Sequence, residues 1–213
     1  MNLAPGARQY ALPPLVAAIP LAVVSPPLGA LALALGGFVV HFFRDPERSP
    51  PPRGVVSPAD GRVSVVREEG DRLRIGVFMN VTDVHVLRAP RAGDVQSTTH
   101  RPGAHRPAFS KDSDRNERVD VAFDTYECSM IAGWFARRIY PYVSTGDSVA
   151  RGDRIGHIAF GSRADVLLPA AYDRDDLLVA EGDTVRAGET AVALRAESGG
   201  VAGDGADADP GAA

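Results

Sequence analysis

Three side chains of the sequence are of types that could do covalent chemistry together. Asp60 lies in SPADG, His85 lies in DVHVLRAP and Ser162 lies in FGSR. A serine hydroxyl is a weak nucleophile, so it needs an adjacent base, and the base needs a third group that orients it. A hydroxyl, an imidazole and a carboxylate form such a set. The glycine before the serine tolerates backbone angles that other residues do not.

Each of these residues also has an ordinary structural explanation. Asp60-Gly61 is a common turn pair, and Gly161-Ser162 is a frequent loop dipeptide. A histidine in mid-strand, such as His85, is more often structural than catalytic. Taken singly, the three segments therefore predict nothing, and only their combination indicates a function.

The amino-terminal part of the chain is apolar. From Ala11 to Phe43 there is no Asp, Glu, Lys or Arg, and Ser25-Pro26-Pro27 divides the stretch into two runs. A straight membrane crossing needs about 20 apolar residues, so we expect residues 1–43 to form a tilted or re-entrant helical hairpin. Arginines flank it, beginning with Arg8 and Arg44, which predicts that both ends lie on the cytoplasmic side. A cleaved signal peptide and a buried pair of core helices are the alternatives.

A proline-rich stretch, residues 44–53, is expected to be a stiff linker. From residue 54 to 197, β-branched residues cluster between Gly, Pro, Asp and Asn, which predicts a mainly β domain. One helix is expected, over Trp134–Tyr140, and residues 198–213 are expected to be a disordered tail with nothing to bury. The expected strands are Val63–Arg67, Leu73–Phe78, Val84–Leu87, Val119–Phe123 and Ile155–Phe160.

A weak internal repeat supports the β assignment. Residues 146–152 and 182–188 share the pattern G-D-x-V-x-x-G. Each copy predicts a turn that enters a strand, with glycines at positive φ. Such turns recur in barrel-sandwich, lipoyl-like folds, so we expect that fold class with a two-fold-like internal pseudosymmetry.

Composition narrows the function classes. The formal net charge is -4 and no basic stripe with interleaved aromatics occurs, so nothing indicates nucleic-acid binding. The single cysteine, Cys128, excludes an intrachain disulfide, and the five histidines lack zinc-type spacing, so no metal site is expected. Lys111 is the only lysine and lies in a polar loop segment, so an electrophile for amine chemistry is not expected on a lysine.

In this order and spacing, the three segments resemble the phosphatidylserine decarboxylase family, and most of all its short, archaeal-type branch. The resemblance covers roughly residues 38–195. Further matching segments are Arg44-Asp45-Pro46, Asn116-Glu117-Arg118, Ile131-Ala132-Gly133 followed by Ala136-Arg137-Arg138-Ile139, and the stretch from Gly156 to Pro169.

The resemblance implies a self-cleaving precursor. Ser162 would attack the carbonyl of Gly161, with His85 as base and Asp60 as the group that orients it. The chain would part into a large chain, 1–161, and a small chain, 162–213, that stay together as a heterodimer. Ser162 would become a pyruvoyl group, which forms a Schiff base with the amine of phosphatidylserine and draws off the electrons left by carbon dioxide.

The sequence departs from the family pattern at three places. Many members carry a second histidine where Arg88 stands, so His85 would serve both self-cleavage and proton donation, or another group takes one task. The segment from His100 to His105 resembles a family segment that usually carries Lys-Phe where Ala104-His105 stand. This segment is a candidate to line the substrate entrance. His157 could face the site through strand periodicity, although a surface position is expected.

We therefore expect a membrane-attached decarboxylase that converts phosphatidylserine to phosphatidylethanolamine at the cytoplasmic face of the cell membrane. On charge alone, Arg137, Arg138 and Arg163 are candidates to meet the lipid phosphate. Two alternatives stay open. One is a non-catalytic, membrane-tethered barrel-sandwich adaptor, and the other is a pyruvoyl decarboxylase for a different amine-bearing substrate.

Overall fold

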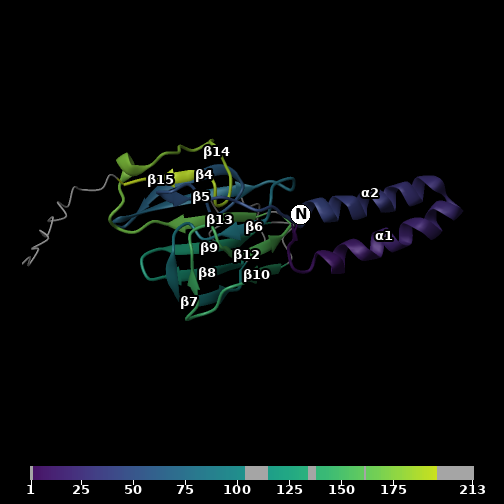
Figure 1. The fold of residues 1–213 in the computed structure, drawn as a ribbon, viewed down its shortest axis with the longest axis horizontal. Coiled ribbons are helices and arrows are strands. Elements are labelled where there is room, and N and C mark those ends of the chain that lie inside the picture. The colour runs from purple at the N-terminus through teal and green to yellow at the C-terminus, as the bar shows by residue number, and fades with distance from the viewer. Residues whose placement is uncertain (1, 104–114, 134–137, 161, 196–213) are drawn as a thin grey trace, which may run out of the picture.

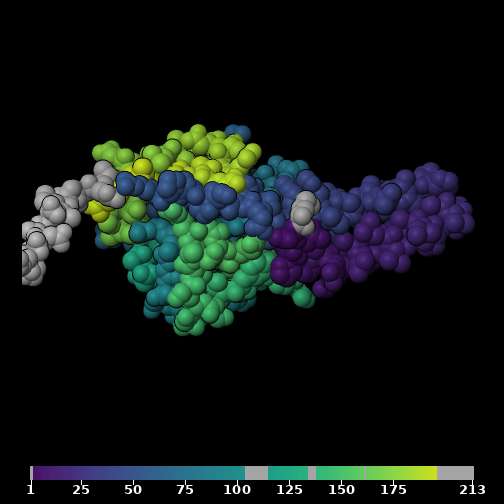
Figure 2. All heavy atoms as spheres, in the orientation of Figure 1, coloured from purple at the N-terminus to yellow at the C-terminus, as the bar shows by residue number. Residues whose placement is uncertain are grey.

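A computed structural model describes residues 2–103, 115–133, 138–160 and 162–195. Two helices, α1 (Ala7–Val24) and α2 (Pro26–Phe42), form a hairpin that projects from one end of a β domain (Figure 1). Figure 2 shows that only the base of this hairpin packs against the β domain, while the rest stands clear of it. The mainly β fold with an amino-terminal helical hairpin is thus confirmed.

The β domain is built on one large antiparallel sheet. Its eight strands run in the order β11-β7-β8-β9-β13-β5-β4-β14, and they do not close into a barrel within the described residues. A three-stranded sheet, β10-β12-β6, lies beside it at the hairpin end (Figure 1), and β15-β3 and β1-β2 are short pairs. The strands are β1 (Asn2–Leu3), β2 (Arg44–Asp45), β3 (Val55–Val56), β4 (Gly61–Glu69), β5 (Arg72–Met79), β6 (Val86–Arg88), β7 (Gly93–Arg101), β8 (Arg118–Phe123), β9 (Glu127–Ala132), β10 (Arg138–Pro141), β11 (Ser148–Val149), β12 (Arg154–Ala159), β13 (Ser162–Leu167), β14 (Thr184–Val185) and β15 (Ala191–Ala193).

The expected strands all coincide with or overlap observed ones, but the expected helix over Trp134–Tyr140 is wrong where it can be checked. Arg138–Pro141 is strand β10, paired antiparallel with β12, and residues 134–137 lie outside the described residues. The apolar and aromatic residues there face a neighbouring strand, so tertiary pairing decides the conformation. The expected tail, 198–213, also lies outside the described residues.

Glycines allow the two helices of the hairpin to approach closely. A Cβ added at Gly29 would lie 2.4 Å from Ala22, and one at Gly36 would lie 2.4 Å from Leu15. Pro26 begins α2, where its missing N–H costs nothing. By length and composition α1 could cross a membrane, whereas α2 falls short of that length.

The two copies of the repeat occupy equivalent places. The backbone N–H of Gly146 donates to Val95 and that of Gly182 donates to Val63, both at 2.8 Å, so each turn closes on a different long strand. This equivalence is what a two-fold-like arrangement predicts. The repeat glycines all have positive φ: 94° at Gly146, 88° at Gly152, 98° at Gly182 and 71° at Gly188.

The segment after the hairpin is fastened to the β domain by charge pairs. The Arg44 guanidinium donates to the carbonyl of Thr82 at 2.7 Å. The buried Asp45 carboxylate accepts from Arg88 at 3.2 Å and from Arg154 at 2.6 Å. Because both guanidiniums belong to the β domain, the joint between hairpin and domain is held at several points.

Candidate active site

Ser162 lies at the centre of the large sheet. It begins β13 and pairs with Met79 of β5 on one side and Ala132 of β9 on the other. Its side chain is fully buried, and the hydroxyl contacts the sulfur of Met79 at 3.8 Å. Sulfur is a weak acceptor, so this hydroxyl is not held by a strong hydrogen bond. Gly161, the other residue of the expected cleavage site, lies outside the described residues.

The residue before that glycine has a strained backbone. Phe160 has φ +67°, and among the described residues it is the only non-glycine with positive φ. For a bulky L-residue this conformation costs about 1–2 kcal/mol and persists only where neighbours enforce it. The strained residue therefore directly precedes the Gly161-Ser162 dipeptide.

His85 is buried immediately before β6. Its Nδ1 is 2.9 Å from the carbonyl oxygen of Asp83, while its Nε2 is buried without a hydrogen-bond partner among the described residues. Its ring lies against that of Phe42, with 4.2 Å between centroids. Burial lowers the pKa of His85 to about 4, and the positive charge of Arg44 acts in the same direction. The imidazole is therefore neutral at physiological pH.

Asp60 lies in the turn before β4 and is held in place by two bonds. Its carboxylate accepts from Arg48 at 2.8 Å and from the backbone N–H of Ala187 at 2.8 Å. Burial raises its pKa, and the nearby charge of Asp83 adds to this, although both hydrogen bonds oppose the shift. Gly61 and Asp83 line the same cavity, so the Asp60 turn lies near the segment that leads into His85.

No hydrogen bond joins Ser162, His85 and Asp60 to one another in the described part of this uncut chain. Each has other contacts: Ser162 with a sulfur, His85 with a backbone carbonyl and Asp60 with Arg48. Catalytic hydrogen bonds are often long or absent before the reacting complex forms. The assignment of these three residues as a catalytic set stays a prediction.

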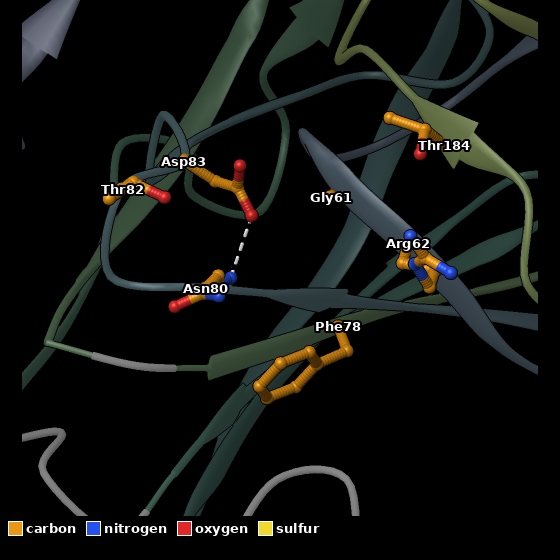
Figure 3. A pocket seen from close by; sticks show the side chains of 7 residues that line it. All are labelled: Gly61, Arg62, Phe78, Asn80, Thr82, Asp83 and Thr184. Carbon is orange, nitrogen blue, oxygen red and sulfur yellow. Dashed lines mark hydrogen bonds between the residues drawn. The ribbon is translucent and has the colours of Figure 1, made fainter.

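A cavity of about 320 Å³ lies between the Asp60 turn and the segment before His85. Figure 3 shows the Asp83 carboxylate at its edge, accepting from the backbone N–H of Asn80 at 2.7 Å. Its lining includes Phe78, which pairs across the sheet with Arg163, whereas its neighbour Met79 pairs with Ser162. The cavity therefore lies beside the end of β5 that carries Met79, whose sulfur contacts the Ser162 hydroxyl. The full lining is Gly61, Arg62, Phe78, Asn80, Thr82, Asp83 and Thr184.

His157 was expected at the surface, and this is wrong. Its side chain is 1% exposed, its Nδ1 is 2.7 Å from the Tyr142 hydroxyl, and its ring stacks on Tyr140 at 4.5 Å. Burial lowers its pKa to about 4, and its Nε2 has no partner among the described residues. His157 pairs with Val86, the residue after His85, and both imidazoles are buried, so they share one buried region.

The other singled-out residues lie elsewhere. Arg88 donates to Asp45, to Pro46 and to the carbonyl of Gly152, so its guanidinium is committed to the segment after the hairpin. Arg163 is buried in a two-bond ion pair with Asp165, which leaves it poorly placed to meet a lipid phosphate. His100 is exposed and paired with Glu117, Arg138 is exposed, and both His105 and Arg137 lie outside the described residues.

An aromatic cluster at the hairpin base was not foreseen from the sequence. The Phe42 ring stacks on Phe160 at 4.7 Å and lies tilted against His85 at 4.2 Å. Tyr10 and Phe43 meet the Phe160 ring edge-on. Phe42 and Phe43 end an apolar run, so their types predict only insertion into lipid. The signal that could have found them is their position, directly before the charged residue that begins the β domain.

Comparison with known proteins shows the family to which the chain belongs. Residues 35–193 match the family model described as phosphatidylserine decarboxylase. A protein of Halobacterium salinarum named putative archaetidylserine decarboxylase proenzyme is 58% identical over 89% of this chain and 97% of its own length. A phosphatidylserine decarboxylase proenzyme of Streptomyces avermitilis is 45% identical over 82% of this chain and 86% of its own. A putative archaetidylserine decarboxylase proenzyme of Methanopyrus kandleri is 41% identical over 89% and 97%.

Proposed function

Because the chain belongs to the phosphatidylserine decarboxylase family, we propose that it is a self-processing precursor that converts phosphatidylserine to phosphatidylethanolamine in phospholipid synthesis. The observation that carries the self-processing is the position of Ser162. Its weakly held hydroxyl lies at the start of a central strand, two residues after the strained Phe160. The chain also buries His85, whose Nε2 has no partner among the described residues.

The self-cleavage needs only residues of this chain. The Ser162 Oγ forms a bond to the Gly161 carbonyl carbon as the C–N bond breaks, which leaves an ester and an amine. His85 takes the hydroxyl proton and returns it to that amine. Loss of the Ser162 α-proton then expels the Gly161 carboxylate. Addition of water and loss of ammonia convert the dehydroalanine that is left into a pyruvoyl group.

The residues present fit this chemistry. A neutral imidazole can accept a proton, and burial keeps His85 neutral. The partly buried carboxylate of Asp60 is the acidic group that could stabilise a charged His85 once the two approach. The pyruvoyl ketone supplies the electron sink that loss of carbon dioxide from an amine-bearing carbon requires. Arg88 stays protonated and cannot act as a base, so it does not replace the second histidine of the family.

The two products would remain associated. β13, which would begin the small chain, pairs with β5 and with β9 along its whole length, and both of these strands belong to the large chain. Separating the chains would break the centre of the sheet. A heterodimer of 1–161 and 162–213 is therefore the expected mature form.

The hairpin would hold the enzyme on the membrane. Its outward side chains are apolar, and the arginines nearest to it lie on both flanks, at Arg8 and Arg44, which favours a cytoplasmic β domain. A lipid substrate requires a site at headgroup depth, and a hairpin anchor provides it. The exposed apolar residues of the hairpin are Leu12, Val16, Ile19, Val23, Val24, Leu28, Leu31, Leu33, Leu35 and Phe38.

Mass spectrometry of the purified protein tests self-processing. The wild type should give two chains that meet between Gly161 and Ser162, with the small chain blocked to Edman sequencing by its pyruvoyl group. Ser162→Ala should remain full length and inactive, because it lacks both the nucleophile and the pyruvoyl precursor. A single uncut and unmodified polypeptide from active wild-type material would contradict the proposal and require different chemistry. An uncut and inactive wild type would leave the adaptor alternative.

A second candidate substrate comes from two relatives. The Halobacterium salinarum and Methanopyrus kandleri proteins are named for archaetidylserine, which shares the serine headgroup and differs in the lipid part. Assays on vesicles of phosphatidylserine and of archaetidylserine, matched in surface concentration, would compare the two lipids through kcat/KM. A serine ester without lipid chains serves as the control for headgroup recognition alone.

A further inference from the structure

The last turn of α2 places one aromatic ring against both His85 and Phe160. The Phe42 ring is 1% exposed. One face stacks on Phe160, with centroids 4.7 Å apart and planes 23° apart, and the ring also lies 4.2 Å from His85 at 32°. Phe42 thus contacts both the expected base and the residue before the expected scissile dipeptide.

The strained backbone of Phe160 needs such support. Tyr10 meets its ring edge-on at 6.0 Å and Phe43 does so at 6.1 Å, so three rings of the hairpin region surround it. A positive φ on a phenylalanine persists only where its surroundings enforce it, and the ring contacts of Phe160 are part of those surroundings. All three of these ring contacts come from the hairpin and its flanks.

We propose that Phe42 is a positioning residue for self-cleavage, and that seating of the hairpin on the β domain is therefore coupled to formation of the pyruvoyl group. This rests on the proposed function, because it presupposes cleavage at Gly161-Ser162. Phe42 fixes the ring of Phe160, and through it the backbone before the scissile bond. The same ring covers His85 and keeps water from its imidazole.

The exclusion of water from His85 by the Phe42 ring can be measured through the protonation of the imidazole. The groups that act on its imidazole are the carbonyl of Asp83, which favours the protonated form, and Arg44 and His157, which oppose it together with burial. Truncating Phe42 leaves these groups in place and lets water reach the imidazole. The protonation of His85 should then move toward that of an ordinary histidine.

The test compares Phe42→Ala with Phe38→Ala in the full-length chain in detergent micelles. Phe38 lies one turn earlier on α2 and contacts Phe42 at 6.4 Å, but it is 41% exposed and has no ring contact with His85 or Phe160 among the described residues. Loss of the ring contacts with Phe160 and His85 should slow precursor disappearance by about 10- to 100-fold in Phe42→Ala. Phe38→Ala should process within about twofold of the wild type, since it removes no contact to either residue.

A profile of the cleavage rate against pH separates positioning from a general loss of stability. In Phe42→Ala the acidic limb of the profile should move to higher pH, whereas in Phe38→Ala it should not move. Equal slowing in both variants would overturn the inference, because it would assign the effect to any truncation of the hairpin and not to the Phe42 ring. Normal cleavage in Phe42→Ala would also overturn it.

A second pair of variants keeps the inference testable if Phe42→Ala does not fold. Phe160→Tyr keeps the stacked ring and should process like the wild type, while Phe160→Leu keeps only apolar bulk and should be slowed. Equal rates for the two would count against a role for the ring. A wild type that never cleaves would instead refute the proposed function, so the two failures are distinguishable.

Discussion

Two buried histidines should make the stability of the precursor depend steeply on acid. Burial lowers the pKa of His85 and of His157 from 6.5 to about 4. Between these values the unfolded chain binds protons that the folded chain does not, so the free energy of unfolding falls as pH falls. From about pH 7.5 to about pH 5, each histidine should remove about 2 kcal/mol of stability.

The measurement is urea unfolding of the Ser162→Ala precursor in detergent across this pH range, so that cleavage does not interfere. Replacing either buried histidine by glutamine should flatten the pH dependence by about 2 kcal/mol over the range, since that side chain no longer takes up a proton in the unfolded state. His100→Gln is the matched control, because it removes an exposed imidazole instead of a buried one. Curves for His85→Gln and His157→Gln that run parallel to the parent would refute the argument from burial.

Three further outcomes are expected. Asp45→Asn should lower the unfolding free energy by about 3 kcal/mol in denaturant titrations, because it leaves two guanidiniums of the β domain without their shared carboxylate, whereas Glu47→Ala at an exposed pair should cost under about 1 kcal/mol. Deleting residues 1–43 should abolish sedimentation with vesicles, and full vesicle binding by the deletion would show that the anchor lies elsewhere. In time courses of precursor disappearance, His85→Ala should block cleavage nearly completely and Asp60→Asn should slow it strongly. Normal processing by His85→Ala would show that another group is the base for Ser162.

Much of the β domain could be predicted because its signals are local. The repeated G-D-x-V-x-x-G segments specify turns through glycines at positive φ, and all four glycines have it. Alternation of β-branched residues gave five strands within a few residues of their observed bounds. Charge-free runs around Ser25 gave the hairpin for the same reason, since a helix break and apolar composition are properties of the segment itself.

What could not be predicted depends on contacts between distant segments. Arg138–Pro141 has no helix or strand preference strong enough to resist pairing with β12, so the helix assigned there failed. His157 alternates along β12 like any strand residue, and only the packing of Tyr140 and Phe43 around it explains its burial. Asp60 and His85 were grouped by family resemblance. Their separate hydrogen-bond partners, Arg48 and the carbonyl of Asp83, are properties of the folded chain.

In a membrane, the joint between the hairpin and the β domain would set the depth of the proposed site. α1 has 18 residues and is therefore about 27 Å long, close to the roughly 30 Å of a bilayer's hydrocarbon core. The hairpin ends at Phe42, whose ring touches His85, and Asp45 is bonded to two arginines of the β domain three residues later. A rigid joint of this kind leaves little freedom for the domain to tilt away from the membrane. An inserted hairpin would therefore hold His85 and Phe160 at the level of the lipid headgroups, where a serine headgroup could reach them without leaving the bilayer.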